Sequence, residues 1–165
     1  MSNTQTIQTI EIDIDDSKLE AFTKFCARHD IDTETITNKV FHGVSFECED
    51  GEYYVLTDTE ALELCEEYIK ETLWAFNASF LSAHMKADED AIRALQNSGQ
   101  CESLNPFLLS AIDCFDHFVW DAINADGRGH FLSSYDGEEH SETAYISKSS
   151  DGTTVAQDFY IYKIN

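Results

Sequence analysis

The stretch VSFECEDGEYYVLTDTEALELCEEYIKETL, residues 44–73, decides the fold. Its first half places strand-forming residues on both sides of Asp50 and Gly51. An Asp-Gly pair supplies the positive φ angles that a tight hairpin turn requires. The sequence therefore predicts a β-hairpin between Val40 and Leu56.

A helix is predicted directly after the hairpin. Thr57 and Glu60 have the spacing of a capping box, in which the hydroxyl and the carboxylate each satisfy a free backbone amide. Apolar residues then recur at helical spacing, at Leu62, Cys65 and Ile69. These features predict an amphipathic helix over residues 58–76.

Periodicity in the flanking segments predicts further elements. Alternating isoleucines indicate a strand near residues 10–14, and Ser17 with Glu20 matches another capping box, which begins a helix near 17–29. Short helices are expected over residues 78–86, capped by Asn77, and over 87–97. Asn105 followed by Pro106 is typical of a helix start, and here it predicts a long core helix that ends near Asn124.

The C-terminal third has a different pattern, with short β-type runs separated by Asp-Gly turns at residues 136–137 and 151–152. The runs cover residues 130–132, 144–147, 153–156 and 159–164. Strands at both ends of the chain around a helical middle favour an α+β fold. We expect central amphipathic helices packed with a small antiparallel sheet built from N-terminal and C-terminal strands. A single domain over residues 1–165 is expected, with residues 1–6 frayed.

The charge of the chain restricts its partners. Among 165 residues there are 32 Asp and Glu against 10 Lys and Arg, giving a formal net charge of −22. Direct attraction to nucleic acid or to an anionic membrane requires clustered cations, so a protein with a basic surface is the expected partner. The sequence has no secretory signal and no membrane span, and its scattered, odd set of cysteines indicates free thiols, so a cytoplasmic location is expected.

Acidic residues are concentrated in the first half of the chain, and nine of them form the candidate partner-binding set: Glu47, Glu49, Asp50, Glu52, Asp58, Glu60, Glu63, Glu67 and Glu71. On a helix the last four form one stripe. With Glu66 included, the carboxylates from Glu60 to Glu71 average about 4 Å apart along the helix axis, close to the ~3.4 Å phosphate spacing of a DNA strand. The stripe therefore predicts a DNA mimic, although a plain solvated face has the same pattern.

The densest polar block is the loop over residues 126–140. Its candidate functional residues are Asp126, Arg128, His130, Tyr135, Asp136, Glu138 and Glu139. The spacing does not fit a calcium loop, and two histidines ten residues apart are weak evidence for zinc. The alternatives are a catalytic, small-molecule or metal site, or a structural turn in which Arg128 pairs with a neighbouring carboxylate. No nucleotide-binding, hydrolase or metalloprotease motif is present, so no catalytic residue, cofactor or metal is predicted.

Four blocks of the sequence, residues 55–61, 68–80, 125–139 and 159–165, resemble a group of small uncharacterised acidic proteins encoded by tailed bacteriophages. The resemblance implies a phage source and expression in the host bacterial cytosol, and it carries over no activity. Small acidic phage proteins include DNA-mimicking inhibitors of defence systems. The resemblance therefore favours an accessory protein that inhibits a host nucleic-acid-binding protein in restriction or another defence system. The alternatives are an enzyme or ligand-binding protein centred on the 126–140 loop, or a virion protein.

Overall fold

The structure is a computed structural model that describes residues 16–34, 36–40, 44–147 and 154–165. The strand predicted near residues 10–14, the frayed N-terminus and the turn at 151–152 lie outside these residues. The predicted α+β class is confirmed, since helices pack with an antiparallel sheet made of N-terminal and C-terminal strands. No helix in the described ranges is both long enough and apolar enough to cross a membrane.

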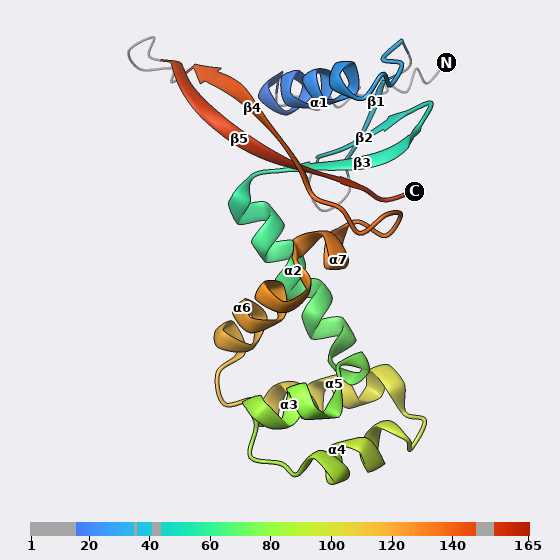
Figure 1. Cartoon of the computed structure of the whole chain (residues 1–165), viewed down its shortest axis with the longest axis vertical. Coiled ribbons are helices and arrows are strands. Elements are labelled where there is room, and N and C mark those ends of the chain that lie inside the picture. The colour runs from blue at the N-terminus through green and yellow to red at the C-terminus, as the bar shows by residue number, and fades with distance from the viewer. Residues whose placement is uncertain (1–15, 35, 41–43, 148–153) are drawn as a thin grey trace, which may run out of the picture.

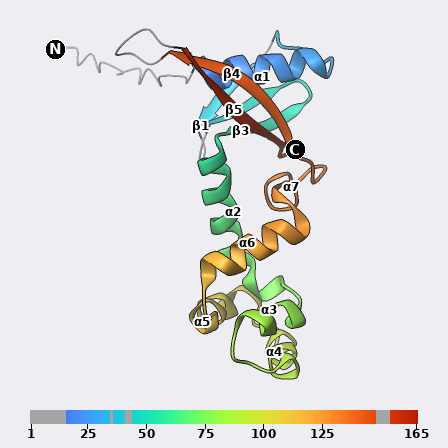
Figure 2. The same cartoon turned by 60° about the vertical axis from the view of Figure 1, so that its left-hand side comes forward.

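The elements, in chain order, are α1 (Asp16–Arg28), β1 (Thr37–Val40), β2 (Val44–Cys48), β3 (Gly51–Leu56), α2 (Asp58–Thr72), the 3-10 helix η1 (Leu73–Ala75), α3 (Ala78–His84), α4 (Glu89–Gln96), the 3-10 helix η2 (Cys101–Leu104), α5 (Asn105–Ala111), α6 (Phe115–Asp126), α7 (Arg128–Leu132), β4 (His140–Ser147) and β5 (Thr154–Lys163). Figure 1 shows an elongated molecule, with the sheet and α1 at one end, α3, α4 and α5 at the other, and α2 running between them. The turned view in Figure 2 keeps the same order.

The sheet has the strand order β1-β2-β3-β5-β4, and all of its pairs are antiparallel. The predicted hairpin is confirmed as β2 and β3. Its turn residue Gly51 has a φ of +140°, and a Cβ at this position would lie 2.1 Å from the backbone oxygen of Asn165. β3 then pairs with the C-terminal strand, with Val55 opposite Ile161. The hairpin therefore places the C-terminal strand β5 inside the sheet, between β3 and β4.

Each face of the sheet packs on a separate hydrophobic cluster. Phe159 and Ile161 of β5 join Phe22 and other residues of α1 on one face. Tyr162 belongs to the cluster built by α2 and the later helices, and the partly buried Tyr160 packs against that cluster. This alternation along β5 follows the period of two predicted from the sequence.

Two predictions of secondary structure are wrong. The long helix expected from Asn105 to Asn124 is broken between α5 and α6, where Ile112 is extended and forms an isolated bridge with Met85. The run at residues 130–132 belongs to the short helix α7, not to a strand. The break at Ile112 was not predictable, because a bridge to a distant segment does not alter the helical pattern of the sequence. The run at 130–132 was not predictable, because three residues are too few to distinguish a strand from a helix by periodicity.

The capping predictions have mixed outcomes. Thr57 and Glu60 form the predicted capping box at the start of α2. Ser17 lies inside α1, one residue after its start, and Asn77 makes no side-chain capping hydrogen bond. The Asn105 side chain does not cap its own helix, because it accepts a 2.9 Å hydrogen bond from the backbone N–H of Trp74 and donates to the carbonyl of Glu71. Asn105 therefore joins α5 to the end of α2.

The cysteines in the described structure are free, as predicted. Cys26 and Cys65 lie in the two hydrophobic clusters, and burial raises the pKa of each thiol to about 12. The thiols therefore stay protonated. Cys114 is exposed, because it lies at the break before α6.

The ion pair between Lys18 and Glu60 joins α1 to the start of α2 across the sheet region. The Lys18 amino group is buried and donates to both carboxylate oxygens of Glu60, at 2.7 and 2.8 Å. Burial alone would raise the pKa of Glu60, but the hydrogen bonds from Lys18 and Thr57 outweigh it and hold the pKa below its usual value. The pair therefore stabilises the fold while Glu60 is ionised.

The substitution Glu60→Gln should destabilise the protein at about pH 7 and much less at about pH 3. A depressed pKa in the folded state contributes stability above the unfolded-state value near 4.3, and that contribution is lost as the pH falls through the folded-state pKa. Urea unfolding of both proteins over this range measures the difference. Glu63→Gln is the matched control, because Glu63 is exposed on the same helix. An equal and pH-independent effect of both substitutions would contradict the role of the pair.

Candidate functional site

At least four of the nine residues in the predicted acidic set are engaged in contacts within the protein. Glu60 pairs with Lys18. Further contacts, in the order of the chain, are Asp50 with Lys163 at 2.7 Å and with the Tyr53 hydroxyl, Glu52 with the Ser45 hydroxyl at 3.0 Å, and Asp58 with Arg128 at 2.8 Å. Glu47 is half-buried on β2, and Glu49 is exposed at the hairpin turn. The nine residues therefore do not form one continuous free surface.

Three members of the predicted stripe remain open to solvent on α2. Glu63, Glu67 and Glu71 are exposed, and within the described part of the chain their carboxylates make no hydrogen bond or ion pair. Four residues of helix separate neighbours by roughly 6 Å along the axis, so the free carboxylates are about twice as far apart as DNA phosphates. Glu60 and Glu66 are paired with lysines, so the unpaired carboxylates of the stripe do not reach the phosphate-like density expected from all five.

The cations share one feature that the sequence did not reveal. Every lysine and arginine whose side chain the structure describes lies within 4 Å of a carboxylate: Lys18, Lys24, Arg28, Lys70, Lys86, Arg93, Arg128 and Lys163. Each cation thus neutralises a carboxylate of the same chain. The charge left for contact with other molecules is negative over the described surface.

Arg128 is the centre of the 126–140 loop. Its guanidinium donates to both carboxylate oxygens of Glu139, at 2.8 and 3.0 Å, and to Asp58 of α2 at 2.8 Å. It also lies 4.1 Å from the centre of the Tyr160 ring, a cation–π contact. The side chain is only 15% exposed, so the structural interpretation of Arg128 has direct support.

Glu139 and Asp136 of the loop both accept hydrogen bonds from side chains or amides of the same chain. The Tyr162 hydroxyl donates to Glu139 at 2.6 Å, and burial together with this hydrogen bond raises the pKa of Tyr162. Asp136 accepts hydrogen bonds from the Ser133 hydroxyl at 2.6 Å and from the Glu138 amide at 2.9 Å. Burial would raise the pKa of Asp136, but these hydrogen bonds lower it, so Asp136 is not a proton donor at neutral pH.

The remaining candidate residues of the loop are separated from one another. Tyr135 is exposed, and the Lys163 amino group lies 4.3 Å from the centre of its ring. Glu138 is exposed, 3.7 Å from His140. Asp126 and His130, at the other end of the loop, line a pocket. The structure thus divides the predicted loop site into a structural part around Arg128 and an open part at the pocket.

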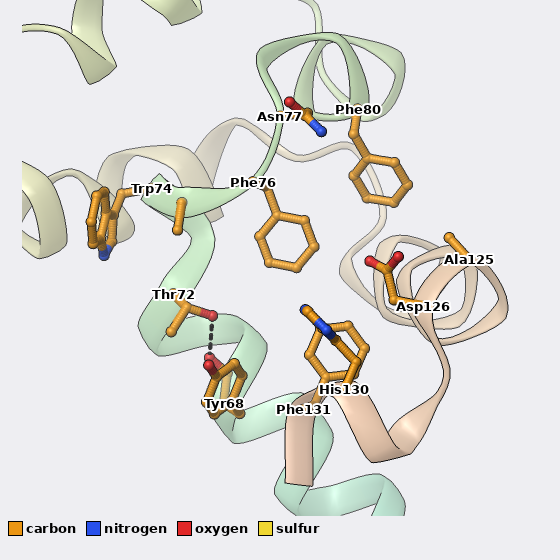
Figure 3. Close-up of a pocket in the computed structure, with 11 residues that line it drawn as sticks. Tyr68, Thr72, Trp74, Phe76, Asn77, Phe80, Ala125, Asp126, His130 and Phe131 are labelled. Carbon is orange, nitrogen blue, oxygen red and sulfur yellow. Dashed lines mark hydrogen bonds between the residues drawn. The ribbon is translucent and has the colours of Figure 1, made fainter. Parts of the chain in front are cut away.

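The pocket has a volume of about 550 Å³ and lies between α2, η1, α3, α6 and α7. Its lining is largely aromatic and comprises Tyr68, Thr72, Trp74, Ala75, Phe76, Asn77, Phe80, Ala125, Asp126, His130 and Phe131. Figure 3 shows Phe76, Phe80, Asp126 and His130 around one space, and the Trp74 ring apart from them. A second, smaller pocket shares Tyr68 and Phe131 and includes Glu67 and Glu71. The volume and lining suit a small organic ligand.

One group of side chains in the described residues has an arrangement that can hold a metal ion, namely His84, His117 and Asp121. His84 ends α3, and the other two lie one turn apart on α6. No metal site was predicted at these residues from the sequence. The separation of four residues between His117 and Asp121 was a usable signal, but the contribution of His84 depends on the packing of α3 against α6.

Comparison with known proteins gives no relative for the chain: no family model, curated protein or solved structure matches it.

Replacing Arg128 with Met should lower the free energy of unfolding by about 2–3 kcal/mol, because the substitution leaves Glu139 without its charged donor. The matched control is Arg93→Met. Arg93 is 55% exposed and pairs with Glu89 within one helix, so its loss should change stability by no more than about 0.5 kcal/mol. Urea unfolding monitored by circular dichroism measures both effects. Equal losses in the two variants would contradict a central role for Arg128.

Proposed function

We propose that the protein is a non-enzymatic inhibitor that binds a basic, nucleic-acid-binding host protein through its acidic surface, as an anti-defence accessory protein of a phage would. The observation that carries this proposal is that every Lys and Arg whose side chain the structure describes pairs with a carboxylate of the same chain. A partner with a basic groove would meet an excess of unpaired carboxylates and cations that already pair within the chain. Such charge complementarity favours fast association and selects against anionic partners.

The proposed contact surface is centred on the exposed face of α2. Glu63, Glu67 and Glu71 project from this face, and Tyr68, which is 45% exposed, lies on the same helix. Lysines or arginines that normally hold phosphates would pair with the carboxylates, and the Tyr68 ring would add an apolar contact. Because the free carboxylates are spaced more widely than phosphates, the mimicry is of charge and not of the regular DNA backbone.

The triple substitution of Glu63, Glu67 and Glu71 by Gln should weaken binding to a captured host protein by roughly tenfold or more, since three charge contacts are lost. The partner is obtained by pull-down from bacterial lysate at low salt. A captured protein counts as the partner only if it binds duplex DNA and if duplex DNA displaces the acidic protein from it. Affinity is then measured at increasing salt, where a steep decrease is expected.

A charge-matched control separates α2 from the bulk charge. Glu34→Gln, Glu102→Gln and Asp116→Asn together remove the same three charges from exposed positions outside α2. This control should retain most of the affinity. An equal loss in both triple variants, or no loss in the α2 variant, would refute the proposed surface.

The aromatic pocket favours a second candidate function, the binding of a small organic cation. Its walls combine aromatic rings with the Asp126 carboxylate, and rings with a nearby anion are the chemistry that holds quaternary ammonium groups. In this candidate function the ligand binds at Asp126 and His130, where the 126–140 loop meets the pocket. Arg128 has only a structural role.

A tetraalkylammonium ion should shift the backbone amide NMR signals of Asn77 and Phe80 in a saturable titration. Asp126→Asn should weaken this binding by about fivefold or more, because the substitution removes the counter-charge. Asp116→Asn, an exposed change on the same helix, is the control and should have little effect. Shifts spread evenly over the acidic surface, or equal effects of the two substitutions, would rule out the pocket.

A further inference from the structure

The region between α3 and α6 contains two imidazoles and a carboxylate that converge without bonding to one another. The Nε2 atoms of His84 and His117 lie 3.4 and 3.6 Å from the same carboxylate oxygen of Asp121. Both distances exceed the 2.7–3.2 Å or so of an ordinary N–H···O hydrogen bond. The ligand atoms of the three residues all lie within 4.8 Å of one another.

The position of His84 requires an explanation. Its side chain is only 10% exposed, and among the described residues no hydrogen bond satisfies its ring nitrogens. Buried polar groups are nearly always hydrogen-bonded, so a nearly buried imidazole without a hydrogen bond requires a specific role, and binding an ion is one such role. The ring is held between Phe80 and Phe118, whose centres lie 4.9 and 5.1 Å from its own, with its Nε2 on the side of Asp121.

The backbone holds these elements in place. The amide of Asp113 donates a 2.9 Å hydrogen bond to the carbonyl of His84, and Met85 forms a β-bridge with Ile112. The start of α6 is thereby fixed against the end of α3. On α6, His117 and Asp121 project from the same face, since residues four apart on a helix are neighbours.

The geometry points to a binding site for a divalent transition-metal cation of the zinc class, with His84, His117 and Asp121 as its ligands. Two ligands about 2.1 Å from a tetrahedral zinc ion lie roughly 3.4 Å from each other, which agrees with both distances to Asp121. Two imidazole nitrogens and one carboxylate oxygen suit zinc and its neighbours better than calcium or magnesium. The net charge of −22 adds a favourable field for any cation.

The site is open on one side. The His117 side chain is 64% exposed, so it is free to adjust its ring toward the ion, and solvent can reach the fourth coordination position. Three protein ligands with a water in the fourth position define the open type of zinc site. Occupation of the site would also join α3 to α6 and stabilise the fold by mass action.

Titration of metal-free protein with Zn²⁺ by calorimetry tests the site. One equivalent should bind, and His117→Ala or Asp121→Asn should each weaken binding by at least about tenfold, as expected for the loss of a direct ligand. His117 and Asp121 are chosen because His84 also packs between two aromatic rings. Thermal unfolding of the metal-free ligand variants should match that of the wild type, whereas Zn²⁺ should raise the Tm of the wild type more than that of either ligand variant.

Two controls exclude unspecific binding to the acidic surface. Asp116→Asn removes the same charge from an exposed position of α6, and His130→Ala removes an exposed histidine outside the site. Both should bind Zn²⁺ within about twofold of the wild type. Absence of saturable binding, or an equal loss in Asp116→Asn and Asp121→Asn, would overturn the proposal. The outcome is independent of the acidic-surface proposal, which rests on other residues.

Discussion

The structure depends on the contacts that the Arg128 guanidinium makes with two carboxylates and an aromatic ring. The guanidinium pairs with Asp58 at the start of α2 and with Glu139 just before β4, and it stacks on Tyr160 of β5. These contacts connect the segment after β3, the loop before β4 and the last strand, which are far apart in the sequence. A buried charge is tolerated when it is paired and hydrogen-bonded. Arg128 meets this condition, because two carboxylates accept its hydrogen bonds and an aromatic ring covers its face.

The same rule applies to the other cations. Ten Lys and Arg against 32 Asp and Glu make each cation scarce, and those whose side chains the structure describes all pair with carboxylates of the same chain. Lys18 and Lys163 hold Glu60 and Asp50, which were expected to face a partner. An acidic protein of this kind thus keeps its fold by local neutralisation and leaves the excess carboxylates, such as Glu63 and Glu67, in solvent.

The sequence predicted the parts of the fold that depend on neighbours along the chain. The hairpin at Gly51, the capping box at Thr57 and the alternation of Phe159 and Tyr160 are local patterns, and the structure contains all three. The break before α6 was missed because Ile112 satisfies the helical pattern, whereas its extended conformation goes with a bridge to the distant residue Met85.

The candidate sites were less predictable for the same reason. The charge of Glu60 is visible in the sequence, but its pairing with Lys18, 42 residues away, is not. Arg128 was expected to pair with a carboxylate, and Glu139 is the partner the structure provides. The aromatic pocket and the group around His84 require helices that meet only after folding.

The hydrophobic cluster beneath the sheet has one more consequence. It includes Leu56 and Tyr162 from the strands and continues through α2 to Ile92 of α4, near the far end of the molecule. Cutting the chain between the strands and the distal helices would leave apolar surface on both fragments. The elongated shape in Figure 1 therefore does not make the two ends separable pieces, and limited proteolysis in the middle of α2 would yield fragments prone to aggregation.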